Sequence, residues 1–119
     1  MSTPYIGIIV EEGIIDNRII NQFNVKAVHI TGHKKPSDRW HMYEVVASEE
    51  EIYDLANYMV DGWYAHFWSG DLVIAVFKKR YFKFMYSDRN TWSEVLSYGK
   101  KIGISEEQLD FPITGLSQP

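Results

Sequence analysis

The chain of 119 residues contains no cysteine, which excludes disulfide bonds, thiol nucleophiles and thiolate metal sites. No apolar run approaches the roughly 20 residues that a membrane-spanning helix needs, so we expect no membrane partner. Glycine-rich phosphate loops and the Gly-x-Ser-x-Gly pattern of serine hydrolases are also missing. These absences disfavour phosphate-loop nucleotide binding and serine-based hydrolysis.

Positive charge is also scarce. Lysine and arginine total 12 against 16 aspartates and glutamates, for a formal net charge of -4. Because affinity for phosphate backbones comes mostly from clustered basic residues, this balance disfavours a nucleic-acid partner. One basic cluster, Lys78–Arg80, adjoins aromatic residues as in RNA-recognition sheets, but Tyr81 and Lys83 stand where that motif has small residues.

The beginning of the sequence, Met1–Pro4, shows no basic stretch before an apolar one. We therefore expect no secretory signal and a cytoplasmic location.

Hydrophobic residues make up 45% of the sequence and charged residues 24%, which is typical of a folded domain. The length suits one domain with one core. From Pro112 the composition turns to proline, glycine, serine and glutamine. We predict a single α+β domain over residues 1–111 and a flexible C-terminal tail over residues 112–119.

The second half of the chain is dense in aromatic and aliphatic residues. Strand-like runs at 63–68, 72–77 and 81–86 are separated by the turns Ser69–Asp71 and Lys78–Arg80. Short β-rich runs joined by turn residues predict an antiparallel meander.

The first half predicts three more strands. Residues 5–10 are apolar on both faces, as in a strand inside a sheet. Residues 25–31 and 39–47 flank the polar loop 32–38 and predict a hairpin.

Two capping boxes predict the starts of helices. Ser48 with Glu51, and Thr91 with Glu94, have the required spacing of three. Apolar residues at helical spacing follow each of them: Ile52, Leu55, Ala56 and Met59 after the first, and Trp92, Val95, Leu96, Gly99 and Ile102 around the second.

The order of these elements predicts the fold. It runs strand, helix, two strands, helix, three strands, helix, with strand–helix–strand occurring twice. We expect a two-layer α+β sandwich, ferredoxin-like or related, with a mainly antiparallel sheet and the helices on one face. The other face of that sheet would be left free.

The last half of the chain resembles a family of small uncharacterised prokaryotic proteins. The similar segments are Trp63–Phe67, Val76–Lys78 with Phe82–Lys83, and Tyr98–Phe111. The resemblance covers residues 63–111 and is strongest in the last helix and the turn after it. The family has no established activity, so the resemblance implies a compact domain and no catalytic or binding residue.

His66 is the most informative polar residue in the meander. Strand alternation places it on one face with Tyr64 and Trp68. A polar group among rings is typical of a small-ligand site, whereas the structural alternative is a histidine that satisfies a nearby hydroxyl or carbonyl. With Tyr43 and His41 from the hairpin, these three are the candidate ligand- or partner-binding residues. His66 and Tyr64 would form hydrogen bonds, and Trp68 and Tyr43 would offer stacking surfaces.

Aromatic residues make up 15% of the chain and occupy both faces of the strands. A small subunit has limited room for so many rings, so we expect the free sheet face to be covered by a second copy, as in a homodimer. A small apolar or aromatic ligand, or a protein partner, is the competing cover. The function expected from these residues is non-catalytic binding or self-association, without a cofactor.

A metal-dependent enzyme is the alternative. If Thr31 pairs with His41 in the hairpin, then His29, His33 and His41 share one sheet face and could hold a transition metal. A shift of one residue in this register would remove His41 from the set.

Overall fold

The computed structural model describes residues 4–116. Within them, six strands form one sheet in the order β2-β3-β1-β4-β5-β6, and every neighbouring pair is antiparallel. The strands are β1 (Tyr5–Val10), β2 (Asn24–Ile30), β3 (His41–Ala47), β4 (Ala65–Ser69), β5 (Leu72–Phe77) and β6 (Arg80–Met85). The α-helices are α1 (Glu49–Leu55) and α2 (Ser93–Lys101), and the 3₁₀ helices are η1 (Glu11–Gly13), η2 (Asn17–Gln22), η3 (Pro36–Asp38), η4 (Ala56–Tyr58), η5 (Arg89–Trp92) and η6 (Glu106–Gln108).

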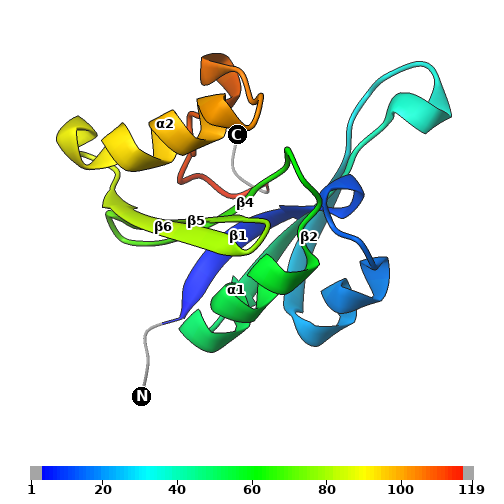
Figure 1. Ribbon diagram of the computed structural model, residues 1–119. Coiled ribbons are helices and arrows are strands. Elements are labelled where there is room, and N and C mark those ends of the chain that lie inside the picture. The colour runs from blue at the N-terminus through cyan, green and yellow to red at the C-terminus, as the bar shows by residue number, and fades with distance from the viewer. Residues whose placement is uncertain (1–3, 117–119) are drawn as a thin grey trace.

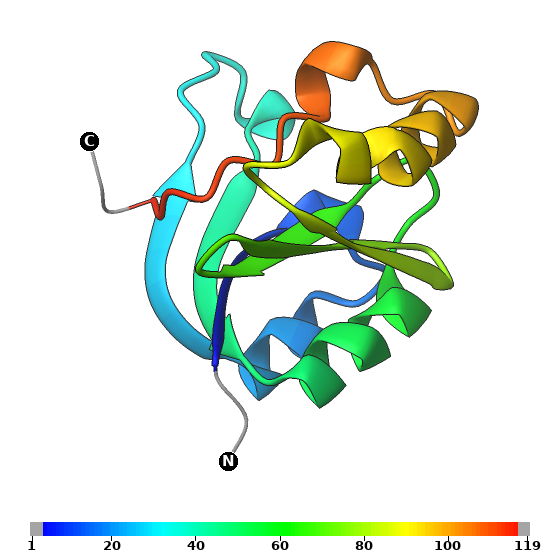
Figure 2. The same ribbon diagram turned by 90° about the vertical axis from the view of Figure 1, so that its left-hand side faces the viewer.

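The α+β class and the antiparallel sheet are confirmed, but the helices do not share one face. Helix α1 lies below the sheet in Figure 1 and α2 lies above it, and Figure 2 shows the same arrangement from the side. The cause is visible in β5, whose residues are all apolar and therefore need cover on both sides. The ferredoxin-like arrangement is not confirmed, because the sheet continues beyond β4 with β5 and β6, and α2 covers its second face.

Each sheet face has its own core. On the α1 side the buried residues are Tyr5, Ile9, Ile14, Ile19, Ile20, Phe23, Val45, Ala47, Ile52, Leu55, Ala56, Met59, Ala65, Phe67, Ile74 and Val76. On the α2 side they are Ile8, Trp68, Val73, Ala75, Phe77, Phe84, Trp92, Val95, Ile104, Leu109 and Phe111. Rings from both faces of the strands are thus buried inside one molecule, and the ring content does not by itself require a second subunit.

Close packing in the sheet depends on a glycine in β1. Gly7 lies between Val45 of β3 and Phe67 of β4. A Cβ atom at this position would overlap the Phe67 ring. The missing side chain therefore allows a fully buried phenylalanine to lie flat over the central strand.

The starts of the helices differ in how well the sequence predicted them. The Ser48–Glu51 capping box is present, with both reciprocal hydrogen bonds. The predicted Thr91 cap is wrong, because Thr91 lies inside η5 and its hydroxyl oxygen accepts from the backbone N–H of Met85 at 2.9 Å. The Asp88 side chain caps η5, which runs directly into α2.

The segment after α2 crosses the sheet on the α2 side toward β3 and β2 (Figure 2). The Leu116 backbone N–H donates to the Glu44 carboxylate at 2.7 Å, and Ile113 packs against the α2-side core. Residues 112–116, expected to belong to a flexible tail, make these contacts. The rest of that expected tail, 117–119, lies outside the described residues.

In residues 4–116, neither helix has the length and apolar character needed to cross a bilayer.

Candidate functional site

The sheet separates the candidate residues into two groups. Tyr64, His66 and Trp68 lie on the α2 side, on the single face that alternation predicts. His41 and Tyr43 lie on the α1 side, since Tyr43 pairs with Ile9 of the α1-side core. The structure therefore does not bring all five together.

The α2 side carries a cleft of about 410 Å³ between the sheet and the segment after α2. Its volume is within the range of small-molecule sites in proteins, about 300 to 1,000 Å³. The lining residues are Ile8, Val10, Trp40, Met42, Gly62, Trp63, Tyr64, His66, Ile104, Glu107, Gln108, Asp110 and Pro112. We call this the α2-side cleft.

His66 lies in the lining with only 6% of its surface exposed. Its Nε2 is 2.7 Å from the carbonyl oxygen of Pro112. Because a carbonyl only accepts, Nε2 carries the ring proton and Nδ1 has the free lone pair. Burial lowers the pKa of His66, with the Pro112 bond and the Asp110 charge acting in the opposite direction, so the ring is neutral at neutral pH.

The position of Nδ1 follows from the polar contacts. Among residues 4–116, the His66 side chain makes one hydrogen bond, to Pro112. No fully buried side-chain nitrogen or oxygen in this part of the chain lacks a partner. Nδ1 is therefore not fully buried, and His66 lies in the lining of the α2-side cleft.

The backbone turn that supplies the Pro112 carbonyl has an unusual residue. Phe111 has a φ of 42°, in the left-handed region that bulky residues rarely adopt. It is fully buried against the rings of Tyr64, His66, Phe84 and Trp92. Burial of this ring holds the strained turn in place, and the turn fixes the carbonyl on His66.

Tyr64 ties β4 to the segment after α2. Its hydroxyl donates to the backbone carbonyl of Gln108, and its ring packs 4.9 Å from that of Phe111. Burial raises the pKa of Tyr64 far above its ordinary value, and the Asp110 charge adds to this, so the phenol keeps its proton. Trp68 stacks on His66 at 5.4 Å but is buried and lies outside the lining.

Sequence reasoning gave no role to Trp40 and Trp63 in this cleft. Their rings meet edge to face at 5.2 Å, and Trp40 is 38% exposed. Trp40 precedes β3 and Trp63 precedes β4, so only the folded sheet brings them together. Glu107, which lies in η6, and Asp110 were also given no role.

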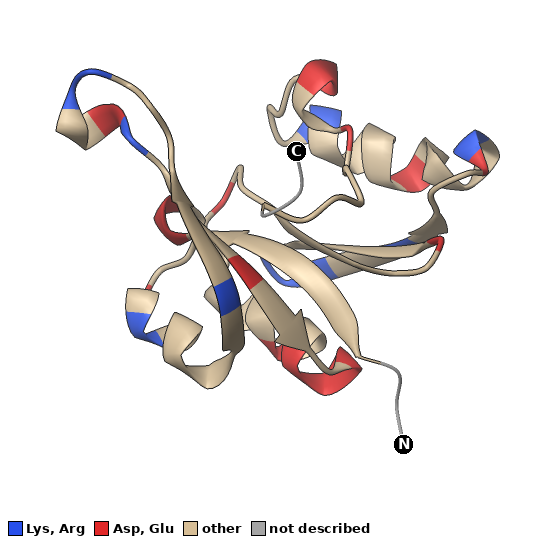
Figure 3. Ribbon diagram, turned by 180° about the vertical axis from the view of Figure 1, so that it is seen from behind, with Lys and Arg blue, Asp and Glu red and all other residues tan. Residues whose placement is uncertain are grey.

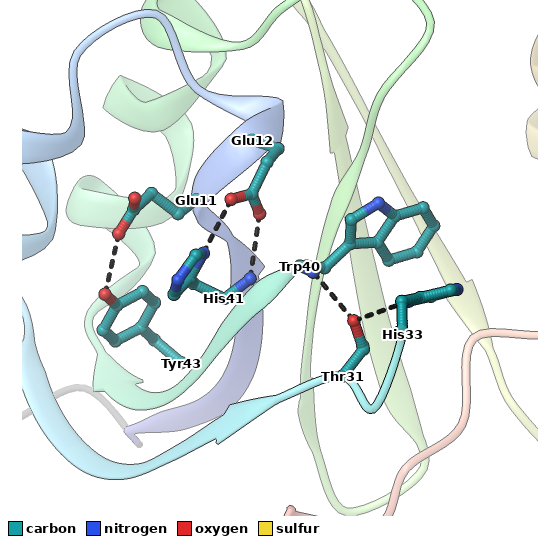
Figure 4. A network of polar contacts seen from close by, with 7 residues as sticks. All are labelled: Glu11, Glu12, Thr31, His33, Trp40, His41 and Tyr43. Atoms are coloured by element: carbon teal, nitrogen blue, oxygen red, sulfur yellow. Dashed lines mark hydrogen bonds and ion pairs between the residues drawn. The ribbon is translucent and has the colours of Figure 1, made fainter. Parts of the chain in front are cut away.

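The α1-side candidates belong to a second polar cluster, at the end of β1 (Figure 4). Glu12 accepts from the His41 backbone N–H at 2.9 Å and contacts its Nδ1 at 2.8 Å. The Tyr43 hydroxyl donates to Glu11 at 2.7 Å. Helix η1 follows β1 directly and lies beside the start of β3, which places both carboxylates against these partners.

The hydrogen bonds in this cluster shift its pKa values. The bond to Glu12 raises the pKa of His41 above its ordinary 6.5. Partial desolvation tends to raise the pKa of Glu12, but the bonds from His41 outweigh it and lower the value below 4.5. The bond to Glu11 raises the pKa of Tyr43. His41 and Glu12 thus form an ion pair at mildly acidic pH.

The histidine set proposed for a metal is not assembled. Ile30, not Thr31, pairs with His41, so the predicted register was wrong by one residue. His29 pairs with Met42 and faces the α2 side, and His33 bonds the Thr31 hydroxyl at 3.1 Å in the loop. In the described part of the chain, the group with metal-ligand spacing is Glu11, Glu12 and His41, whose ligand atoms lie within 4.8 Å. Each of the three residues already makes a hydrogen bond, Glu12 with His41 and Glu11 with Tyr43.

Comparison with protein-family models, curated proteins and solved structures finds no match to this chain. The resemblance to small prokaryotic proteins therefore stays a prediction.

Proposed function

We propose that the protein is a non-catalytic binding domain that holds a small, largely apolar ligand in the α2-side cleft. The observation that carries this proposal is the His66 ring, buried in the lining of the cleft with Nδ1 free of any hydrogen bond among the described residues. A buried acceptor beside aromatic and aliphatic walls is the usual composition of a small-molecule site.

The state of His66 favours binding over proton transfer. Burial lowers the pKa of His66 below its ordinary 6.5, away from neutral pH, while an effective general base has a pKa near the working pH. The Pro112 carbonyl and the Trp68 ring also fix its orientation. A fixed neutral imidazole orients a ligand through one hydrogen bond.

The test is a screen of small aromatic and aliphatic compounds by ligand-observed NMR against wild type and two variants. Met42→Trp fills the cleft from β3. The matched control is Val46→Trp, on the same strand and sheet face but outside the lining. We expect compounds that bind wild type and Val46→Trp and are lost in Met42→Trp. No hits, or hits that Met42→Trp retains, would remove the proposal.

We propose self-association through β2 as a second candidate function. This edge strand exposes Val25, Val28 and Ile30, at 38%, 55% and 51%. A shift of register between Val25 and Ala27 puts all three on the α1 side. An antiparallel partner strand from a second copy would cover this row and pair the free backbone edge.

Sedimentation velocity over a wide concentration range tests this second candidate. We expect a dimer that Val28→Lys abolishes and that Met42→Trp leaves unchanged. A monomer at every concentration would exclude self-association and leave the cleft proposal intact.

A further inference from the structure

The charge on the α2-side cleft has one sign. Glu107 and Asp110 line it, and in residues 4–116 no lysine or arginine does. Within the described part of the chain, neither carboxylate forms an ion pair. The neighbouring Glu106 pairs with Lys100 at 3.2 Å. Figure 3 shows the acidic turn that follows α2. The negative charge at the cleft is therefore available to a ligand.

Asp110 also acts on the interior of the cleft. Its charge contributes to the raised pKa of Tyr64 and opposes the effect of burial on the pKa of His66. All three residues line the cleft, so the Asp110 charge lies where a ligand would meet the two rings.

The two fixed polar groups inside the cleft present acceptors. Nδ1 of His66 has a lone pair and no proton. The Tyr64 hydroxyl donates a hydrogen bond to the Gln108 carbonyl, and its oxygen can still accept one. A ligand that satisfies both must bring hydrogen-bond donors.

The walls suit an apolar body with a positive end. Ile8, Val10 and Ile104 provide aliphatic surface, and Trp40 with Trp63 provides indole rings. Tryptophan faces attract cations more strongly than other aromatic side chains.

We propose that the ligand of the α2-side cleft is a small organic ammonium ion with at least one N–H and an apolar or aromatic body. The ammonium donates to His66 Nδ1 and is attracted by Asp110 and Glu107, while the body lies against the tryptophans. This inference rests on the proposed binding function and narrows it to one ligand class.

Three probes with closely similar skeletons test the inference by titration calorimetry at pH 7.5. They are 2-phenylethylammonium, 2-phenylethanol and 3-phenylpropionate. We expect the ammonium to bind at least about tenfold more tightly than the alcohol, and the carboxylate most weakly. Raising the salt concentration should weaken the ammonium alone.

The outcomes separate this inference from the proposed function. If the alcohol or the carboxylate binds as tightly as the ammonium, and Met42→Trp abolishes that binding, the cleft is a binding site but the ammonium inference is overturned. If none of the three probes binds, the ammonium inference is also overturned, and the compound screen decides the binding function.

Charge-removing variants give a second test. Asp110→Asn and Glu107→Gln should each weaken the ammonium about threefold to fivefold, the range of a partly exposed ion pair, and leave the alcohol unchanged. The matched control is Glu50→Gln, at an exposed position in α1 on the other sheet face. Equal weakening of ammonium and alcohol would mean that the carboxylates act only on structure, and would overturn the inference.

Discussion

The two faces of the sheet are built from the same strands but differ in how their polar side chains are bonded. On the α1 side, the polar groups at the end of β1 are partly exposed and pair with one another: the Tyr43 hydroxyl donates to Glu11, and His41 bonds Glu12. On the α2 side, His66 is bonded at one nitrogen and open at the other, beside a cleft. Our proposal places the ligand on the face where a buried histidine keeps one nitrogen without a hydrogen bond.

The pKa values of the two histidines are shifted in opposite directions. A neighbouring carboxylate raises the pKa of His41, and burial lowers the pKa of His66.

The largest effect comes from truncating a ring in each core. Phe67 on the α1 side and Phe111 on the α2 side are both fully buried. Phe67→Ala and Phe111→Ala should each lower the free energy of unfolding by about 3 to 5 kcal/mol, because each leaves a cavity. Denaturant unfolding followed by circular dichroism and by tryptophan fluorescence checks this. A loss below about 1 kcal/mol for Phe111→Ala would mean that the α2-side core contributes little to the stability of the whole domain.

The next effect concerns Gly7. Gly7→Ala should destabilise the protein by about 1 to 3 kcal/mol, because the new methyl group overlaps the Phe67 ring. Gly32→Ala is the matched control, since a Cβ there meets no atom within 4 Å, and its effect should stay within about 0.5 kcal/mol. Equal denaturation midpoints for the two variants would contradict the packing described for β1 and β4.

The third prediction follows the two histidines by NMR titration. His41 should titrate above its ordinary 6.5 and His66 below it. Glu12→Gln should return His41 toward 6.5 and leave His66 unchanged, because the carboxylate contacts only His41. If both rings titrate together near 6.5, the two histidines do not have the opposite pKa shifts described for the two faces.

The same shifts give opposite pH dependences of stability. His66 takes a proton more readily in the unfolded chain, so its contribution is lost as the pH falls below about 6.5. His41 holds its proton more tightly in the folded state, so its contribution is complete below 6.5 and lost as the pH rises through its raised pKa. Wild type and Glu12→Gln, compared by denaturant unfolding at pH 5.5 and 8, should differ more at pH 5.5.

The smallest effect sharpens the description of the cleft. Asp110→Asn removes a charge that supports the protonated form of His66. The pKa of His66 should therefore fall further below 6.5, while that of His41 stays constant. An unchanged His66 titration would place the Asp110 charge too far away to act on the cleft.

Much of the fold follows from local pattern. Alternation gave the shared face of Tyr64, His66 and Trp68, and the spacing of Ser48 and Glu51 gave the start of α1. These signals depend on neighbours a few residues apart, which a sequence displays directly.

The rest depended on contacts between distant segments. The prediction that α1 and α2 share one face was wrong. The face on which a helix packs depends on contacts between segments far apart in the sequence, which local patterns do not display. The hairpin register failed by one residue because Thr31 and Trp40 close the loop, with the Thr31 N–H bonded to the Trp40 carbonyl. Of the cleft, sequence reasoning found Tyr64 and His66 and missed Asp110, which folding brings to the cleft.

The central position of β1 has a consequence for the order of folding. This first strand of the chain pairs with β3 and β4, whose residues are made much later. The meander β4–β6 closes through two-residue turns, so its strands can pair early. We expect the folding transition state to contain the meander. Strand β1 would pair later and join the meander to the β2–β3 hairpin.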